Sequence, residues 1–371
     1  MKTKKYFIIA FLFIPIVLFG IQPEKLDSLP AFSLSQNIKT TSVKNQYKTN
    51  TCWSYSVLGM LESELIKEGK GSVNLSEMFI VYNTYIDKAE RYFRMQGKIN
   101  FSGGGSLSDP LGVIKKHGIV PIEAYSGLIN GSKYPDHFKM DAVLKSYVDS
   151  IIIKKSITNH WREPFVAILD KYMGKIPSTF VYNNTTYTPL SYAQSLDIRI
   201  ENYEMFSSFI YKPYYCRFVV EVPDNWSLGM AFNLPMDELI AIIDNSLKNG
   251  YSVAVAIDIS EKGFQWDKGL ATFEYPDSIK SKKFDAVFRQ EAFDRYETTD
   301  DHGLQITGKA TDKDGNKYYL VKNSWGTEGT AYEGYIYMSE EYLKNKLITV
   351  MVNKKNLLET VKEKLDPCCI Q

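Results

Sequence analysis

Histidine and cysteine are both scarce in this sequence, with four residues of each among 371. No two cysteines have the C-x-x-C spacing that is typical of zinc sites, so we expect neither a metal nor a cofactor. Adjacent cysteines rarely pair with each other without strain, and the pairing of the four stays open. The cysteines are Cys52, Cys216, Cys368 and Cys369. The candidates for a general base are equally few: His117, His137, His160 and His302.

A strong net charge of either sign is also missing. The 44 Lys and Arg residues nearly balance the 43 Asp and Glu residues. The resulting charge of +1 gives no electrostatic case for binding nucleic acid or an acidic membrane surface. The sequence has no internal repeat and no low-complexity segment. Aromatic residues are abundant, with 26 Tyr and 20 Phe, which suits a globular protein with packed cores and ligand clefts.

Long apolar runs are limited to the N-terminus, where MKTKK precedes a run from Tyr6 to about Ile21. A basic start followed by an apolar stretch is typical of a secretory signal peptide. The run is short for a membrane span, which needs about 18 residues, and Pro15 interrupts it. We therefore predict a signal peptide over residues 1–22, export to the periplasm or secretion, and no stable membrane span after its removal. An uncleaved membrane anchor is the alternative.

A helix is predicted from Cys52 to about Lys67, because apolar residues recur there at helical spacing. Asn50 and Thr51 are residue types that cap helix starts, which places Cys52 at or just inside a helix N-terminus. The partial positive charge at that end favours a thiolate, the nucleophilic form of cysteine. The apolar residues that carry the pattern are Val57, Leu58, Leu61, Leu65 and Ile66.

Further helices are expected to begin near Asn74 and Ser108, and to close the chain over residues 340–346 and 355–364. Residues 127–235 differ in character, since they are rich in Tyr, Lys and Asn and contain three helical stretches. We interpret them as a mostly helical insertion into a main domain that covers residues 23–371.

The last third of the sequence is rich in predicted strands. Residues 252–259 alternate in the manner of a β-strand. Residues 303–310 and 317–322 are predicted to pair as a hairpin, because an Asp-Gly pair lies in their connection. Helices early in the chain and antiparallel strands late in the chain favour the α+β fold class.

The hairpin supplies the base that a nucleophilic Cys52 needs. His302 begins its first strand and Asn323 follows its second, so antiparallel pairing makes them neighbours. An imidazole held by an amide side chain is an oriented base that can take a proton from a thiol. Gln46 and the backbone N–H of Cys52 are candidate donors to the oxyanion that forms when a thiolate attacks a carbonyl.

The order of these residues resembles the papain superfamily, specifically its bleomycin hydrolase (aminopeptidase C) branch. Gln46 stands six residues before Cys52, which Trp53 follows, as in that superfamily. The segment DDH that ends at His302 and the segment VKNSWG around Asn323 resemble the histidine and asparagine motifs of the branch.

The likeness covers essentially all of residues 40–360 and implies a papain-like fold. In that fold a helical half carries the nucleophile on a central helix, and the other half is antiparallel β. The resemblance implies a cysteine-type peptidase, with the aminopeptidase activity of the branch favoured. A peptide is the expected substrate, no nucleic-acid partner is expected, and a homo-oligomer stays open. The implied catalytic residues are Cys52, His302, Asn323 and Gln46.

Two departures from the family pattern keep alternatives open. The triplet TNT replaces the Cys-Gly-Ser that precedes the nucleophile in papain-like sequences, which argues against the papain branch proper. In the family the C-terminal tail lies in the cleft and restricts it to substrate N-termini, but residues 366–371 do not resemble that ending closely. An endopeptidase or amidase, or a non-catalytic binding protein, are the alternatives. A tail that points away from Cys52 would favour the endopeptidase.

Residues 103–105 are three consecutive glycines. We predict that Gly104 and Gly105 form a bare backbone edge on which a peptide substrate lies, because only glycine permits so close an approach. A flexible turn is the alternative. A lone cysteine is more often a buried structural thiol than a nucleophile, so the case for Cys52 depends on its order with Gln46, His302 and Asn323.

Overall fold

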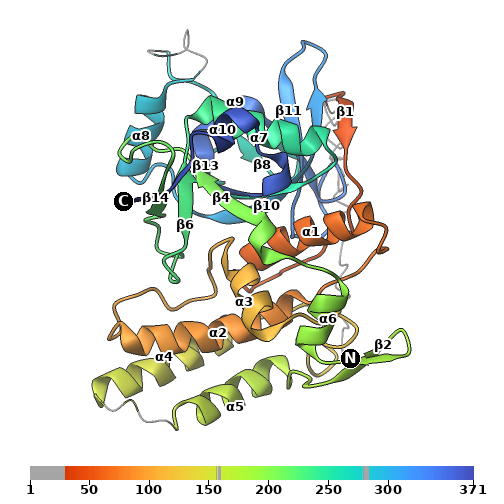
Figure 1. Ribbon diagram of the computed structural model, residues 1–371, viewed down its shortest axis with the longest axis vertical. Helices are drawn as coiled ribbons and strands as arrows, with labels where there is room; N and C mark the ends of the chain where they lie inside the picture. Colours follow the sequence, from red (N-terminus) through yellow and green to blue (C-terminus); the bar gives the residue numbers. More distant parts are fainter. Residues whose placement is uncertain (1–29, 156, 158–159, 278, 280–283) are drawn as a thin grey trace, which may run out of the picture. The chain divides into compact units, whose positions relative to one another are not determined.

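Helix α1 (Cys52–Lys67) runs between the other N-terminal helices and the sheet, as Figure 1 shows. The computed structural model describes residues 30–371 except 156, 158–159, 278 and 280–283. The predicted signal peptide lies outside the described residues. One side of α1 packs against strands of the sheet, and α2 and α3 pack against it from the other direction. The helix predicted from Cys52 to about Lys67 is therefore confirmed, and it is central to the fold.

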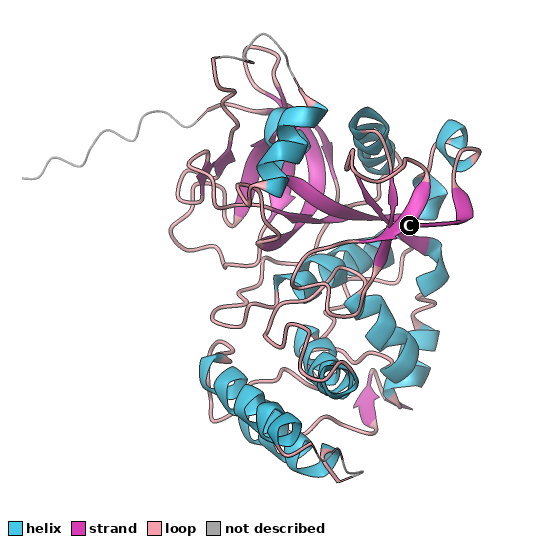
Figure 2. Cartoon of the chain, turned by 90° about the vertical axis from the view of Figure 1, so that its left-hand side faces the viewer, coloured by secondary structure: helices cyan, strands magenta, loops and turns pink. Residues whose placement is uncertain are grey.

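Helices dominate the chain up to Ser195, as Figure 2 also shows in the lower part of the view. Helix α2 is capped by Ser76, whose hydroxyl accepts from the backbone N–H of Phe79 at 3.0 Å. Helix α3 ends at Gly118, where φ is 81°, a conformation that favours glycine. The bounds are α2 (Glu77–Arg94), α3 (Asp109–His117), α4 (Phe138–Ile153), α5 (Arg162–Met173) and α6 (Pro189–Ser195).

A twelve-stranded sheet, counted over the described residues, makes up most of the rest. Its strand order is β14-β5-β6-β4-β13-β7-β10-β11-β12-β9-β8, with β1 paired to β10. Most pairs are antiparallel, which together with the helices confirms a mixed α and β fold. The strands are β1 (Ser33–Asn37), β4 (Tyr203–Ser207), β5 (Cys216–Val219), β6 (Met230–Asn233), β7 (Val253–Ile257), β8 (Phe264–Gln265), β9 (Leu270–Ala271), β10 (His302–Thr311), β11 (Lys317–Lys322), β12 (Tyr335–Ser339), β13 (Leu347–Asn353) and β14 (Asp366–Ile370).

The predicted hairpin is confirmed as β10 and β11, which pair antiparallel around a turn at residues 312–316. Backbone N–H groups of the turn donate to the carboxylate of Asp312, and Gly315 takes a positive φ of 80°. Outside the sheet lie the hairpin β2 (Phe180–Tyr182) and β3 (Thr185–Tyr187), the helices α7 (Met236–Lys248), α8 (Ala286–Asp294), α9 (Glu340–Lys346) and α10 (Glu359–Lys362), and the 3-10 turns η1 (Ile200–Asn202) and η2 (Lys354–Asn356).

The two faces of the central strand β7 serve different cores. Val253, Val255 and Ile257 belong to the apolar cluster that α7 covers. The alternate residues Ala254 and Ala256 belong to the cluster on the side of α1. Because alanine is small, α1 can approach the sheet closely on that side. The alternation predicted for this strand therefore positions the helix that begins at Cys52.

The segment predicted as a mostly helical insertion, residues 127–235, contains α4, α5 and α6 but ends in three strands. Strands β4, β5 and β6 join the main sheet beyond β13. Residues 217–222 have a strand-like pattern that predicts β5, whereas β4 and β6 are short and are held by partners distant in sequence, so local periodicity does not reveal them. The domain boundaries remain a prediction.

The C-terminal region differs from the prediction of a helix over residues 355–364. Only η2 and the single turn α10 are helical, because Leu357 is extended (φ −67°, ψ 136°) and buried against the sheet. Beyond them β14 pairs with β5, and a disulfide joins Cys216 to Cys369. Across the described residues, no helix is long and apolar enough to cross a membrane.

Candidate active site

Cys52 is the first residue of α1, but the side chain of Thr51 does not cap the helix. The Thr51 hydroxyl is instead within 2.6 Å of the Thr49 hydroxyl. The prediction of a helix start is correct, and the prediction of side-chain capping is wrong, since this local pair occupies the hydroxyl. Within the described part of the chain, the Cys52 backbone N–H has no acceptor. It is therefore available to a ligand at the helix start.

The electrostatic surroundings of the Cys52 thiol oppose its ionisation. Burial raises the pKa of the thiol to about 12, although a hydrogen bond from the Gly303 backbone N–H lowers it. The carboxylates of Asp300 and Asp224 raise it further. Burial and these two carboxylates therefore oppose the thiolate that the helix start is expected to favour.

His302 and Asn323 are brought together at one end of the hairpin. The Nε2 atom of His302 lies 2.7 Å from Oδ1 of Asn323. The same Oδ1 accepts from the backbone N–H of Ser324 at 2.7 Å, which identifies it as the amide oxygen. His302 therefore carries its proton on Nε2, and Nδ1 is left as the basic nitrogen.

The imidazole is shielded from water. His302 is 4% exposed. Burial lowers the pKa of its imidazole to about 4, although the hydrogen bond with Asn323 acts in the opposite direction and raises the pKa. The ring of Trp325 packs on it, with 4.7 Å between the ring centroids. No hydrogen bond between His302 and the Cys52 thiol is recorded among the described residues, and such contacts often tighten only when substrate is bound.

Gln46 is held in place by the segment that follows β11 and contains Asn323. Its backbone N–H donates to the Ser324 carbonyl at 2.8 Å, and Asn45 forms a bridge with Trp325. The Ser324 hydroxyl donates to Oε1 of Gln46 at 2.7 Å. The amide nitrogen of Gln46 has no acceptor among the residues that the structure describes, although its residue is 5% exposed. A donor that faces a cleft and has no protein acceptor is suited to bind an oxygen of a ligand.

The predicted residues meet at one cleft of about 470 Å³. Cys52, His302 and Gln46 all line it, and Asn323 lies behind His302. A volume of this size is within the range of small-molecule and peptide sites. The other lining residues include Tyr47, Trp53, Leu107, Asp224, Ile259, Asp300, Asp301 and Trp325.

Gly104 and Gly105 also line this cleft, and their role as a substrate edge stays a prediction. A Cβ atom on Gly104 would overlap the Asp224 carboxylate, and one on Gly105 would overlap the Trp53 ring. Packing against these two side chains is therefore a structural reason for glycine here. Lys88, fully buried, donates to the Gly104 carbonyl and fixes the loop from behind.

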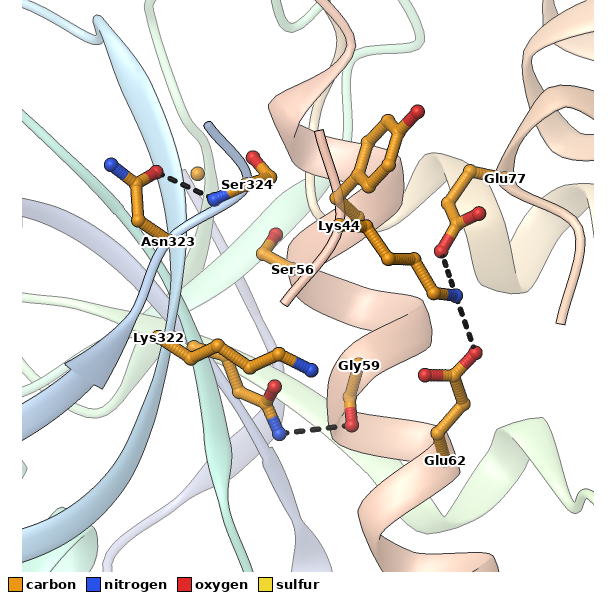
Figure 3. A pocket seen from close by; sticks show the side chains of 11 residues that line it. Lys44, Ser56, Gly59, Glu62, Glu77, Lys322, Asn323 and Ser324 are labelled. Carbon is orange, nitrogen blue, oxygen red and sulfur yellow. Dashed lines mark hydrogen bonds and ion pairs between the residues drawn. The ribbon is translucent and has the colours of Figure 1, made fainter. Parts of the chain in front are cut away.

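A buried ion cluster joins α1 and α2. Figure 3 shows the Lys44 amine between the carboxylates of Glu62 on α1 and Glu77 on α2. Burial opposes the charge of Lys44, but Glu77 and Glu62 outweigh it and raise the Lys44 pKa. Lys322 enters the same pocket from the hairpin and donates to the Thr41 carbonyl at 2.8 Å. The cluster therefore ties the segment before Gln46 to α1 and α2.

Sequence reasoning missed Asp224 and Lys88 as neighbours of the site. Asp224 lies in the connection between β5 and β6, far from the catalytic motifs in sequence. Its carboxylate accepts from Asn100 at 2.7 Å across 124 residues of sequence. No local pattern signals such a contact. Asp300 was visible as part of the segment that precedes His302, but its charge had been given no role.

The C-terminal tail does not line the cleft. Its last strand, β14, runs parallel to β5, and the Gln371 backbone N–H donates to the Arg217 carbonyl at 2.9 Å. The disulfide between Cys216 and Cys369 fastens it there. The tail therefore contributes no carboxylate to the described cleft.

Comparison with known proteins identifies relatives of the whole chain. The model of the Peptidase C1-like family matches residues 185–371, slightly more than half of the sequence. Aminopeptidase C of Lactobacillus delbrueckii subsp. lactis is 25% identical over 92% of this chain and 85% of its own length. Bleomycin hydrolase of Mus musculus is 22% identical over 91% of this chain and 92% of its own.

A solved structure has the same fold. The crystal structure of PepW from Lactobacillus rhamnosis matches with a TM-score of 0.72 at 18% identity, and it covers 90% of this chain and 84% of its own. The match of the family model includes His302 and Asn323, whereas Gln46 and Cys52 precede it. The aligned relatives extend over the region before residue 185 as well.

Proposed function

The chain belongs to the Peptidase C1-like family and is a cysteine peptidase, and on that premise we propose that its catalytic residues are Cys52, His302, Asn323 and Gln46. The observation that carries the proposal is the 2.7 Å contact between His302 and Asn323 at the cleft that Cys52 lines. It leaves a basic Nδ1 on the ring. We further infer that the enzyme acts as an aminopeptidase, because its relatives include aminopeptidases C, G and E.

The first step transfers a proton from the Cys52 thiol to Nδ1 of His302. Burial penalises either charge alone, so thiolate and imidazolium form together and stabilise each other. The thiolate then attacks the carbonyl carbon of the peptide bond. The Gln46 amide and the Cys52 backbone N–H, both without protein acceptors, receive the oxygen that becomes negative.

His302 completes the cycle by returning the proton. Imidazolium protonates the leaving amine, and the C–N bond breaks to give a thioester on Cys52. A water molecule that gives its proton to His302 then hydrolyses the thioester and restores the thiol. Asn323 holds the ring through Nε2 during both transfers, and Trp325 keeps water away from that hydrogen bond.

We infer a papain-like arrangement of two halves around this site. The nucleophile begins the central helix α1, which packs between the helices α2 and α3 and the strands β10 and β7. His302 begins β10, so nucleophile and base come from opposite sides of the cleft.

An endopeptidase is the second candidate, and the position of the tail is the observation that favours it. A tail that lies along β5 leaves the cleft without the block found in the family's aminopeptidases. The choice depends on whether another group in the cleft recognises a free amino terminus.

The proposal is tested by Cys52→Ala, with Cys368→Ala as the matched control because Cys368 is the other free thiol in the described residues. Fluorogenic aminoacyl amides and N-blocked peptides serve as substrates. Loss of the nucleophile should reduce kcat by at least about 1,000-fold. The control should keep wild-type activity. Full hydrolysis by Cys52→Ala would exclude this mechanism.

We also propose that the protein is exported to the periplasm or secreted. The disulfide between Cys216 and Cys369 supports this, because disulfides form and persist in oxidising compartments. Fractionation of cells that express the full chain tests it. Recovery of the protein only from the cytoplasm, with both thiols reduced, would contradict it.

A further inference from the structure

Three carboxylates line the cleft beside the proposed nucleophile, and the catalytic mechanism uses none of them. They are Asp224, Asp300 and Asp301. Asp301 is exposed, and its carboxylate accepts from the Thr299 hydroxyl at 2.6 Å. The other two are half-buried and come from different parts of the chain, Asp224 from the β5–β6 connection and Asp300 from the approach to β10.

Asp224 has one carboxylate oxygen to spare. Its Oδ1 accepts from the Asn100 amide at 2.7 Å, and its side chain rests on the bare backbone of Gly104. The charge of Lys88 acts on Asp224, but the Lys88 amine donates to the carbonyls of Ser102 and Gly104 instead. Asp224 therefore keeps a negative charge that no protein ion pair neutralises within the described residues.

Asp300 is in a similar state. It accepts no hydrogen bond from a side chain among the described residues, and no Lys or Arg there pairs with it. Burial, together with the charges of Asp224 and Asp301, raises the pKa of its carboxyl to about 7. The carboxylates of Asp224 and Asp300 repel each other, and a cation bound between them would remove that repulsion.

An independent feature of the cleft also calls for a ligand. The amide nitrogen of Gln46, a residue that is 5% exposed and lines the cleft, lacks an acceptor among the described residues. The cleft thus offers hydrogen-bond donors at the start of α1 and carboxylates close by. Both Asp300 and Asp224 are near enough to Cys52 for their charges to act on its thiol.

The N-terminal residue of a peptide presents the complementary groups. Its carbonyl oxygen is an acceptor, and its α-ammonium is a cation with three donors, only one carbon away from the carbonyl carbon. When Cys52 attacks that carbonyl, the ammonium must lie close to the thiol, in the zone where Asp224 and Asp300 act. A blocked or internal residue brings an amide there and no charge.

We propose that Asp224 and Asp300 together bind the α-ammonium of the substrate's first residue and so restrict this cleft to free amino termini. The inference rests on the proposed function, and it assigns to two side chains a task that the tail of this chain does not perform. A bound ammonium also neutralises two charges that oppose the Cys52 thiolate. Substrates with a free amino terminus therefore favour ionisation of Cys52, so their binding also raises the rate of attack on the carbonyl.

The test compares an aminoacyl fluorogenic amide with its N-acetylated form in the full chain. Asp224→Asn and Asp300→Asn should each lower kcat/KM for the free amine by roughly 10- to 100-fold, the range for a lost charged hydrogen bond. Hydrolysis of the acetylated substrate should stay constant or rise. Asp314→Asn, an exposed carboxylate in the β10–β11 turn, is the matched control and should change neither.

Two outcomes would overturn the inference. One is an equal loss on both substrates, which would assign the carboxylates to the fold or to the reactivity of Cys52. The other is a wild-type enzyme that cleaves both substrates equally well. Failure of the proposed function looks different, since Cys52 would then resist labelling by a thiol-directed epoxide and neither substrate would be cleaved. If Cys52 is labelled and the enzyme is active, but Asp224→Asn and Asp300→Asn have no effect, only the ammonium site is rejected and the proposed function stands.

Discussion

At the scale of single residues, the site depends on polar groups that the protein leaves without partners. The backbone N–H of Cys52 lies in the first turn of α1, where helical N–H groups lack partners, and it has no acceptor among the described residues. The Gln46 amide nitrogen stays free because Ser324 occupies only the oxygen. Both residues line the cleft, so these two donors are available to the oxyanion that develops during attack on a carbonyl.

Replacing Gln46 by Ala tests this role directly. Loss of one oxyanion donor should lower kcat by roughly 100- to 1,000-fold, with little change in KM, because the bond forms mainly in the transition state. Steady-state kinetics on an aminoacyl amide measures both constants. Ser324→Ala, which only releases the amide oxygen of Gln46, should cost less. A Gln46→Ala enzyme with wild-type kcat would rule out this donor.

The pH dependence of Cys52 reactivity reports on His302. As pH falls through about 4, the imidazole becomes protonated and can no longer take the thiol proton, so alkylation of Cys52 by iodoacetamide should slow. The hydrogen bond with Asn323 raises the His302 pKa, so Asn323→Ala should shift this acid limb to lower pH. The plateau should fall by about 100-fold, because the ring loses its fixed orientation.

Mass spectrometry of the peptide that contains Cys52 measures the rate at each pH and separates it from Cys368. An acid limb of Asn323→Ala at higher pH than that of the wild type would contradict the assigned hydrogen bond.

At the scale of elements, the buried ions behind α1 connect the parts that carry the site. Lys44 pairs with Glu62 on α1 and Glu77 on α2, just before the segment that bears Gln46 (Figure 3). The carboxylates of Glu62 and Glu77 are almost fully buried. Such a cluster is costly to disrupt on one side only, since the remaining charges stay out of water.

Lys44→Met should therefore lower the free energy of unfolding by about 3–5 kcal/mol. The matched control is Lys116→Met, which breaks the Lys116–Asp87 pair on the surface and should cost at most about 1 kcal/mol. Urea unfolding followed by circular dichroism measures both. Equal losses of unfolding free energy for the two substitutions would show that the buried cluster does not hold α1, α2 and the segment before Gln46 together.

Elements with strong local signals were predictable from the sequence. The helix at Cys52 and the β10–β11 hairpin follow from periodicity and from an Asp-Gly turn, and with them come His302 and Asn323 as neighbours. The pattern of residues 217–222 predicts a strand that overlaps β5, but β4 and β6 were not predictable, because they are only four or five residues long and depend on distant partners. Asp224 was missed for the same reason, since tertiary structure alone brings it to the cleft.

At the scale of the whole molecule, the tail is part of the sheet and not part of the cleft. Cys216 and Cys369 close a loop across 153 residues of sequence and hold β14 on β5. Cross-linking of so long a loop restricts the unfolded chain more than the folded one. The disulfide therefore stabilises the fold, whereas the role proposed for the carboxylates in the cleft is substrate specificity.

Replacing Cys369 by Ser, with Cys368 also replaced to prevent exchange, should lower the free energy of unfolding by about 2–4 kcal/mol. The ratio of activities on free and N-acetylated substrates should stay constant, because the tail does not contact the cleft. Cys368→Ser alone is the control. A changed ratio in the double variant would show that the tail takes part in recognition.

The central claim is that Cys52 attacks the substrate carbonyl, and acid quenching during turnover of a slow aminoacyl ester tests it most directly. Mass spectrometry of the digested protein should then find the aminoacyl mass on the peptide that contains Cys52. It should be absent from the peptide that contains Cys368, the other free thiol of the described residues. Continued turnover with no adduct on Cys52 would contradict the account.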